Sequence, residues 1–273
     1  MAMTTSDRLY QQMKQDITVC SLLPGSPISE AELCKRYRAS RTPVREASRR
    51  LESEGLITIV PFRGYFIAPL TLSEFQNLQE VQLIVEPATA ALAATRATPA
   101  QIKAIETAGK YEYRVGQKNS YFTFLQRNFE LHVGIAEAAQ NDHLVEVTTS
   151  IQTRLMRFFY LIIAMDAFGP ELVNEHERLV SAIRARNALL ASERAADHVR
   201  KTIERSARLL LNPVQGRTGC MRIDVELNAA ALAEAWKADG KRGGKAPRRA
   251  GRKTKEEAAS WNTDDLLATK WPQ

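Results

Sequence analysis

The 273-residue chain contains four histidines, and three of them stand where a shared metal ion would need them. His176 and His198 lie at equal distances on either side of Asn187. If Asn187 caps the second of two antiparallel helices, the two imidazoles come level with each other. His132 belongs to an earlier helix, and Asn128 lies one turn before it on the same face. Three imidazoles and one oxygen ligand suit Zn²⁺, Ni²⁺ or a similar divalent cation.

A single helical histidine is more often a surface residue or a hydrogen-bonded core residue than a ligand, and we expect His143, outside the pattern, at the surface. A metal in a helical bundle also suggests an alternative function, hydrolysis by a metal-bound water. Its general base would be Glu130, Glu175 or Glu177. A glutamate adjacent to a histidine lies about 100° around the helix from it, so most of these carboxylates are expected to point away from the ion. We therefore expect no enzyme.

Arginines form a second group of side chains with a chemical use. Arg45 and Arg49 lie one turn apart on one face of an expected helix that Thr42 caps and Pro43 begins. Arginine can bond bidentately to the O6 and N7 atoms of guanine, and a helix N-terminus favours phosphate. A solvated basic face on an ordinary helix is the alternative interpretation. The helix's place in the surrounding unit favours DNA.

That unit spans residues 1–70 and has the pattern of a winged helix-turn-helix. Helical periodicity predicts a first helix near residues 8–19, and a capping box at Ser29 and Glu32 starts a second one that ends near Tyr37. The arginine-bearing helix follows and ends near Gly55. Two strands, 56–60 and 65–68, then form a hairpin. In this architecture the third helix enters the major groove of DNA.

Residues 71–213 are predicted to form an antiparallel bundle of six helices, or seven, so that the protein is mainly α. We expect Pro87 to kink the first helix or to mark its start. The predicted spans are 72–95, 99–116, 118–139, 141–166, 170–186 and 188–212.

Composition adds limits on partners and location. The sequence has no apolar run long enough to span a membrane and no apolar N-terminal segment of the signal-peptide kind. The cysteines, at 20, 34 and 220, fit neither a disulfide framework nor a zinc ribbon. We therefore expect a cytoplasmic protein.

The last 33 residues carry nine Lys and Arg against four Asp and Glu, so much of the net charge of +7 comes from the tail. Residues 214–273 are expected to be disordered, with or without phosphate contacts of their own.

The N-terminal unit resembles the DNA-binding domain of the GntR family of transcription regulators. The match includes the segments 24–33, 40–47, 50–52, 54–56 and 63–66. The resemblance implies DNA contacts by Ser40, Arg41, Thr42, Arg45 and Arg49, and a wing at Arg63 and Gly64 that reaches the minor groove or the backbone.

This sequence departs from the GntR pattern at two positions. Arg38 stands where glycine is usual, in a turn that calls for positive φ, and Ser48 stands where leucine is usual. Neither change removes a side chain of a DNA-contacting type. We expect both to lower stability.

The helical part resembles the ligand-binding FCD domain of the FadR subfamily, over about residues 72–212, on the residues around His132, His176 and His198. The resemblance implies a metal bound by one aspartate and these three histidines, and a carboxylate effector near it. Asn128 takes the place of the aspartate, and an amide oxygen is a weaker ligand. Gln82 takes the place of an arginine that commonly pairs with the effector, so it is the candidate effector-binding residue.

The predicted protein is thus a homodimeric regulator, expected to be a repressor, that binds double-stranded operator DNA. An organic or sugar acid would control it by favouring one arrangement of the two DNA-binding domains. The hinge is expected around residues 68–70.

Overall fold

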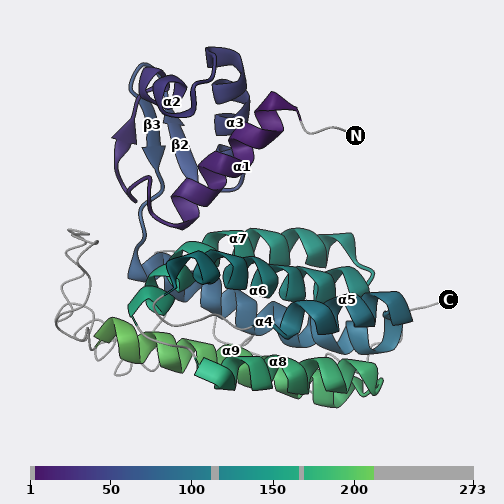
Figure 1. The fold of residues 1–273 in the computed structure, drawn as a ribbon. Helices are drawn as coiled ribbons and strands as arrows, with labels where there is room; N and C mark the ends of the chain where they lie inside the picture. Colours follow the sequence, from purple (N-terminus) through teal and green to yellow (C-terminus); the bar gives the residue numbers. More distant parts are fainter. Residues whose placement is uncertain (1–3, 112–116, 166–168, 212–273) are drawn as a thin grey trace, which may run out of the picture. The chain divides into compact units, whose positions relative to one another are not determined.

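A computed structural model describes residues 4–111, 117–165 and 169–211 of the chain (Figure 1). The predicted tail, 214–273, lies outside these residues. The strands are β1 (Pro27–Ile28), β2 (Ile57–Val60) and β3 (Gly64–Ile67). The helices are α1 (Thr5–Thr18), α2 (Glu30–Tyr37), α3 (Arg41–Ser53), α4 (Leu72–Arg96), α5 (Pro99–Gly109), α6 (Lys118–Ala138), α7 (Asp142–Met165), α8 (Gly169–Arg184) and α9 (Ala188–Leu211).

Reciprocal capping boxes set the starts of the first two helices. The Thr4 hydroxyl accepts from the Asp7 amide while the Asp7 carboxylate accepts from the Thr4 amide, and Ser29 and Glu32 repeat the pattern at α2. Both arrangements satisfy amides that the first helical turn leaves without partners. The apolar faces of α1, α2 and α3 then meet in one core with β2 and β3, with Met13, Ile17, Leu33, Val44 and Leu51 almost fully buried. The predicted three-helix unit is confirmed.

The wing is a three-stranded antiparallel sheet in the order β1-β3-β2. The predicted hairpin is present, with Val60 opposite Gly64 and Ile57 opposite Ile67. The short strand β1 was not predicted, because two residues that begin with a proline carry no strand periodicity. Gly64 has φ of 95°, and a Cβ there would lie 3.2 Å from the Ile28 carbonyl oxygen. Glycine at this position therefore lets β3 approach β1.

The start of α3 differs from the prediction. Ser40, not Thr42, is the N-cap residue, and no side-chain hydrogen bond caps the helix. Pro43 is therefore the third helical residue instead of the first. The prediction was wrong because proline is tolerated throughout the first turn, where no amide has an intrahelical acceptor. Proline alone does not identify the first residue.

The predicted six-helix bundle is confirmed by helices α4 to α9 in the described part of the chain. Helix α4 packs along α9 and also contacts α6, α7 and α8. Figure 1 shows α8 beside α9, and Asn187 caps α9 as expected, its side-chain oxygen accepting from the Leu190 amide. Helix α4 begins at Leu72 and continues through Pro87 to Arg96, so the alternative that Pro87 marks its start was wrong. None of the described helices is both long and apolar enough to cross a membrane.

The predicted end of α5 was wrong. The helix ends at Gly109, not at residue 116, and Lys110 has left helical geometry with φ of −91° and ψ of 2°. Glycine weakens a helix and is common where one stops, which the apolar periodicity alone did not reveal. Residues 112–116 of the predicted span lie outside the described residues.

Two apolar clusters fill the bundle, and α4 contributes to both. Its first turns bury Phe75 and Leu78 in one cluster, and its last turns bury Ala90, Ala93 and Ala94 in the other. Between them, the same helix buries a polar stripe of Gln79, Gln82, Glu86 and Thr89. A buried polar group needs hydrogen-bond partners, so this stripe marks the level of the bundle where polar side chains from other helices must meet.

The C-cap of α2 yields a test of backbone strain. Arg38 has φ of 50° and ψ of 44°, a left-handed conformation that costs a non-glycine residue about 1–2 kcal/mol. Since glycine avoids this cost but loses more entropy on folding, we expect Arg38→Gly to raise the free energy of unfolding by about 1 kcal/mol. Denaturant titration of the full chain measures it. Lys35→Gly, one turn earlier inside α2, should lower stability by about 1 kcal/mol. A loss of stability in both variants would contradict the strain argument.

Candidate functional site

Three helices each bring one histidine to a single point inside the bundle. His132 lies on α6, His176 on α8 and His198 on α9, and all three are buried. One ring nitrogen from each lies within 4.8 Å of the others. The ring centroids are 5.6 Å apart for His132 and His176, 5.3 Å for His132 and His198, and 4.7 Å for His176 and His198. The structure thus brings the three sequence-predicted histidines together.

Glu86 of α4 holds the first histidine. Its Oε1 atom lies 2.9 Å from Nδ1 of His132 and accepts hydrogen bonds from the amides of Gln82 and Gln152, each at 2.8 Å. Burial alone would raise the pKa of Glu86, but His132 and Gln82 keep it below the ordinary value. One carboxylate oxygen therefore connects α4, α6 and α7.

Glu175 of α8 holds His198. Its Oε2 atom lies 3.2 Å from Nδ1 of His198, and Arg205 donates to both carboxylate oxygens at 2.7 and 2.8 Å. Burial alone would raise the pKa of Glu175, but the hydrogen bonds from Arg205 and His198 lower it to about 2. The side chain is therefore a carboxylate anchored to α9 at two places.

These contacts suit a metal site. A carboxylate at Nδ1 orients an imidazole and leaves Nε2 as its coordinating atom, a common arrangement around metal-bound histidines. Burial lowers the pKa of His176 well below its ordinary value and also lowers that of His198, which favours the neutral form that a metal ligand needs. Nε2 of His176 is buried with no hydrogen-bond partner. The donor set fits a divalent cation.

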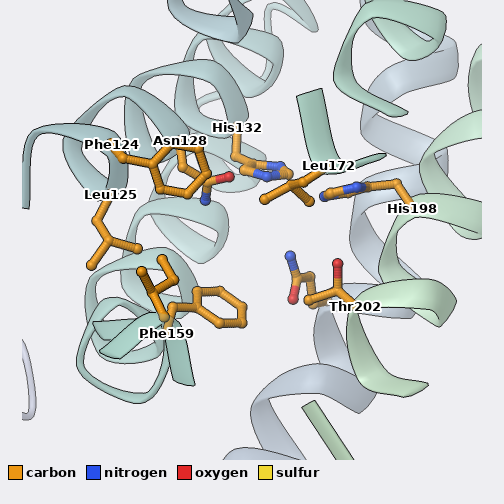
Figure 2. A pocket seen from close by; sticks show the side chains of 10 residues that line it. Phe124, Leu125, Asn128, His132, Phe159, Leu172, His198 and Thr202 are labelled. Carbon is orange, nitrogen blue, oxygen red and sulfur yellow. The ribbon is translucent and has the colours of Figure 1, made fainter. Parts of the chain in front are cut away.

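A pocket adjoins the histidines and includes both residues at which the sequence departs from the FCD pattern (Figure 2). Asn128 and Gln82 line it together with His132 and His198. Figure 2 shows the His132 and His198 side chains reaching toward each other, with Asn128 on the His132 side. The pocket is small, with a cavity volume of about 20 Å³ in this structure.

The predicted DNA-reading side chains lie at the solvent-exposed start of α3. Ser40, Arg41, Thr42, Arg45 and Arg49 are all exposed. Two of the arginines share Glu30 of α2: Nε of Arg45 lies 2.7 Å from its carboxylate, and Nε of Arg41 lies 3.4 Å from it. This contact raises the pKa of Arg45 and lowers that of Glu30. DNA must therefore compete with Glu30 for these arginines.

At the wing, Arg63 is exposed, whereas Gly64 is half-buried and has the backbone role described above. Sequence reasoning missed Phe62, which is fully exposed between β2 and β3 with φ of 62°. Its position between the two predicted strands was the signal that would have indicated an exposed aromatic ring.

The carboxylates of the hydrolase alternative are not poised as general bases. Glu130 is exposed and pairs with Arg127 on the same helix, and Glu177 is exposed. Glu175, one of three glutamates of which most were expected to point away from the ion, holds His198. Its missed partner is Arg205, and helical spacing from Thr202 and His198 along α9 is the signal that would have indicated it.

Comparison with known families places both parts of the chain. Residues 5–67 match the family described as bacterial regulatory proteins, gntR family, and residues 77–201 match the FCD domain. These two matches cover α3, the hairpin of β2 and β3, and all three buried histidines.

Curated relatives and solved structures agree with these matches. The HTH-type transcriptional repressor RspR of Escherichia coli is 25% identical over 202 residues, 73% of this chain and 87% of the relative. The galactonate operon transcriptional repressor of Escherichia coli is 26% identical over 226 residues, 75% and 98% of the two chains. In fold, the chain is similar to McbR/YncC of Escherichia coli, with a TM-score of 0.61 and 16% identity over 76% of this chain and 99% of that one.

The Glu175 anchor yields a test of the site's construction. Glu175→Gln removes the anionic partner of Arg205 and His198, and we expect a loss of about 1–3 kcal/mol in the free energy of unfolding. Thermal and denaturant unfolding of the full chain measure it. Glu171→Gln, an exposed position on the same helix, should change stability by less than about 0.5 kcal/mol. Equal, small effects of both substitutions would show that the anchor contributes nothing.

Proposed function

Because this chain belongs to the GntR family of bacterial transcription regulators and carries an FCD domain, we propose that it represses transcription as a homodimer under the control of a small carboxylate. The family and the relatives are DNA-binding regulators, not enzymes. The observation that carries the regulatory half of the proposal is the convergence of three buried histidines beside a pocket.

DNA recognition in this proposal uses the start of α3 and the wing. Arg45 and Arg49 would read guanine edges in the major groove, and Ser40, Arg41 and Thr42 would contact the backbone near the helix N-terminus. Arg63 and Gly64 form the wing contact. A dimer with two such units matches a pseudo-palindromic operator whose half-sites are about 34 Å apart or a multiple of that spacing. Two relatives are named as transcriptional repressors, which supports repression as the mode of regulation.

The bundle would bind a divalent cation, Zn²⁺ or Ni²⁺, through His132, His176 and His198, with Asn128 as a neutral oxygen donor in the same pocket. When bound, the cation supplies positive charge for the carboxylate of an organic or sugar acid. The name of the galactonate operon repressor supports an acid of this class. Glu86 and Glu175 orient His132 and His198, and Gln82 lines the space that the acid would enter. The acid then regulates by binding one arrangement of the dimer more tightly than the other.

Substitution of the recognition arginines tests DNA binding. Arg45→Ala and Arg49→Ala should each weaken binding to a duplex selected by the full chain from random sequences by about 10- to 100-fold, because each removes a bidentate base contact. Fluorescence anisotropy measures the affinity, and sedimentation of the complex gives the number of chains per duplex. Arg200→Ala, at an exposed arginine of α9, is the control and should leave the affinity for the duplex unchanged. A normal affinity in both α3 variants, or one chain per duplex, would refute the corresponding part of the proposal.

The fourth histidine provides a matched control for metal binding. We expect His176→Ala to lower the affinity for Zn²⁺ and Ni²⁺ by at least about tenfold, and it leaves the contacts of Glu86 and Glu175 in place. His143→Ala, an exposed residue of α7, should bind metal as the unaltered chain does. Equilibrium dialysis with elemental analysis reports both. The proposed site is wrong if the His176 variant retains the full metal content.

A further inference from the structure

The pocket beside His132 and His198 is lined mainly by hydrocarbon. Its apolar wall consists of Phe124, Leu125, Phe159, Ile163 and Leu172, contributed by α6, α7 and α8. Figure 2 shows the two phenylalanines and Leu125 on the side of the pocket away from His198. A wall of this kind favours a ligand with an apolar body, because each buried methylene contributes about 0.8 kcal/mol.

Among the residues that the structure describes, the polar lining of the same pocket carries no positive charge. Apart from the two histidines, these polar side chains are Gln82, Asn128 and Thr202, and no described lining residue is a lysine or an arginine. A second carboxylate on the ligand would therefore be buried without a cationic partner, which is costly.

Gln82 limits how many hydroxyls the pocket can satisfy. Its Nε2 atom donates to Glu86, which fixes the orientation of the amide because a carboxylate only accepts. Its Oε1 atom then remains a buried acceptor with no partner. Thr202 already accepts from Arg205 at 3.3 Å. Gln82, Asn128 and the Thr202 hydroxyl can pair with a few ligand hydroxyls, whereas a hydroxyl on every carbon would leave those that face the apolar wall buried and unpaired.

We propose that this pocket selects a short monocarboxylic acid with a largely hydrocarbon body, in preference to sugar acids and dicarboxylic acids. The carboxylate lies at the histidines, and the hydrocarbon part packs on the Phe124 and Phe159 side. This inference rests on the proposed effector function and narrows its ligand class. The cavity as it stands is smaller than such an acid, so side chains of the wall must move apart when the acid binds.

Three acids with the same number of carbons separate the possibilities. Hexanoate, adipate and gluconate share a six-carbon chain, but adipate adds a second carboxylate and gluconate adds hydroxyls. In calorimetric titrations of the full chain loaded with Zn²⁺, hexanoate should bind at least about tenfold more tightly than either of the others. Gluconate or adipate binding as tightly as hexanoate would overturn the inference while leaving the proposed function intact. Binding of none of the three would count against the carboxylate effector itself.

Paired leucine substitutions locate the selection in the pocket. Leu172→Asn replaces a buried apolar wall residue by an amide of similar size. It should lower the affinity for hexanoate by about tenfold and leave the affinity for gluconate unchanged or higher. Leu189→Asn makes the same change at an exposed position of α9 and should affect neither acid. Zinc content verifies that each variant retains an intact site, and Ile163→Thr serves as a second wall variant. An unchanged preference in Leu172→Asn and Ile163→Thr, with zinc retained, would show that this wall does not select the ligand.

Discussion

Glu86 and Glu175 are carboxylates buried inside a bundle of helices, where an ion without partners costs several kcal/mol. Each therefore needs donors from neighbouring helices: Glu86 gathers α6 and α7 around α4, and Glu175 joins α8 to α9. His132 and His198 owe their orientation to this constraint. The polar layer also explains why α4 is not amphipathic in the ordinary sense, since it buries apolar side chains at both ends and polar ones between them.

Much of the fold follows from local signals in the sequence. Three predicted helix starts agree with the structure: those capped by Ser29 and Asn187 and the one that begins at Pro99. The positive φ at Arg38 was also expected, because Arg38 stands where glycine is usual. The errors have local causes as well. Pro43 is compatible with several positions in the first turn, Gly109 ends α5 before its apolar pattern does, and β1 is too short to have a period.

The candidate site was predictable only in part. His176 and His198 could be placed because an antiparallel turn at Asn187 sets their levels in the bundle, and the resemblance to the FCD domain added His132. The partners of these histidines could not be predicted, because the contact between Glu86 and His132 joins two helices and depends on how those helices rotate about their axes. The same limit applies to Glu30, whose contact with Arg45 depends on the packing of α2 against α3. Residue type indicated the arginines as DNA contacts but did not show that they are already engaged in the free protein.

One oxygen atom links the pocket to the histidine cluster. Oε1 of Glu86 accepts both from Gln82, which lines the pocket, and from Gln152, and it lies 2.9 Å from His132. A ligand that moves Gln82 therefore changes the environment of the carboxylate that orients His132, and an ion that holds His132 restrains Gln82. By thermodynamic linkage such coupling is reciprocal: the ion changes the affinity for the acid by the same factor as the acid changes the affinity for the ion. The availability of the ion in the cell would then set the concentration of acid to which the regulator responds.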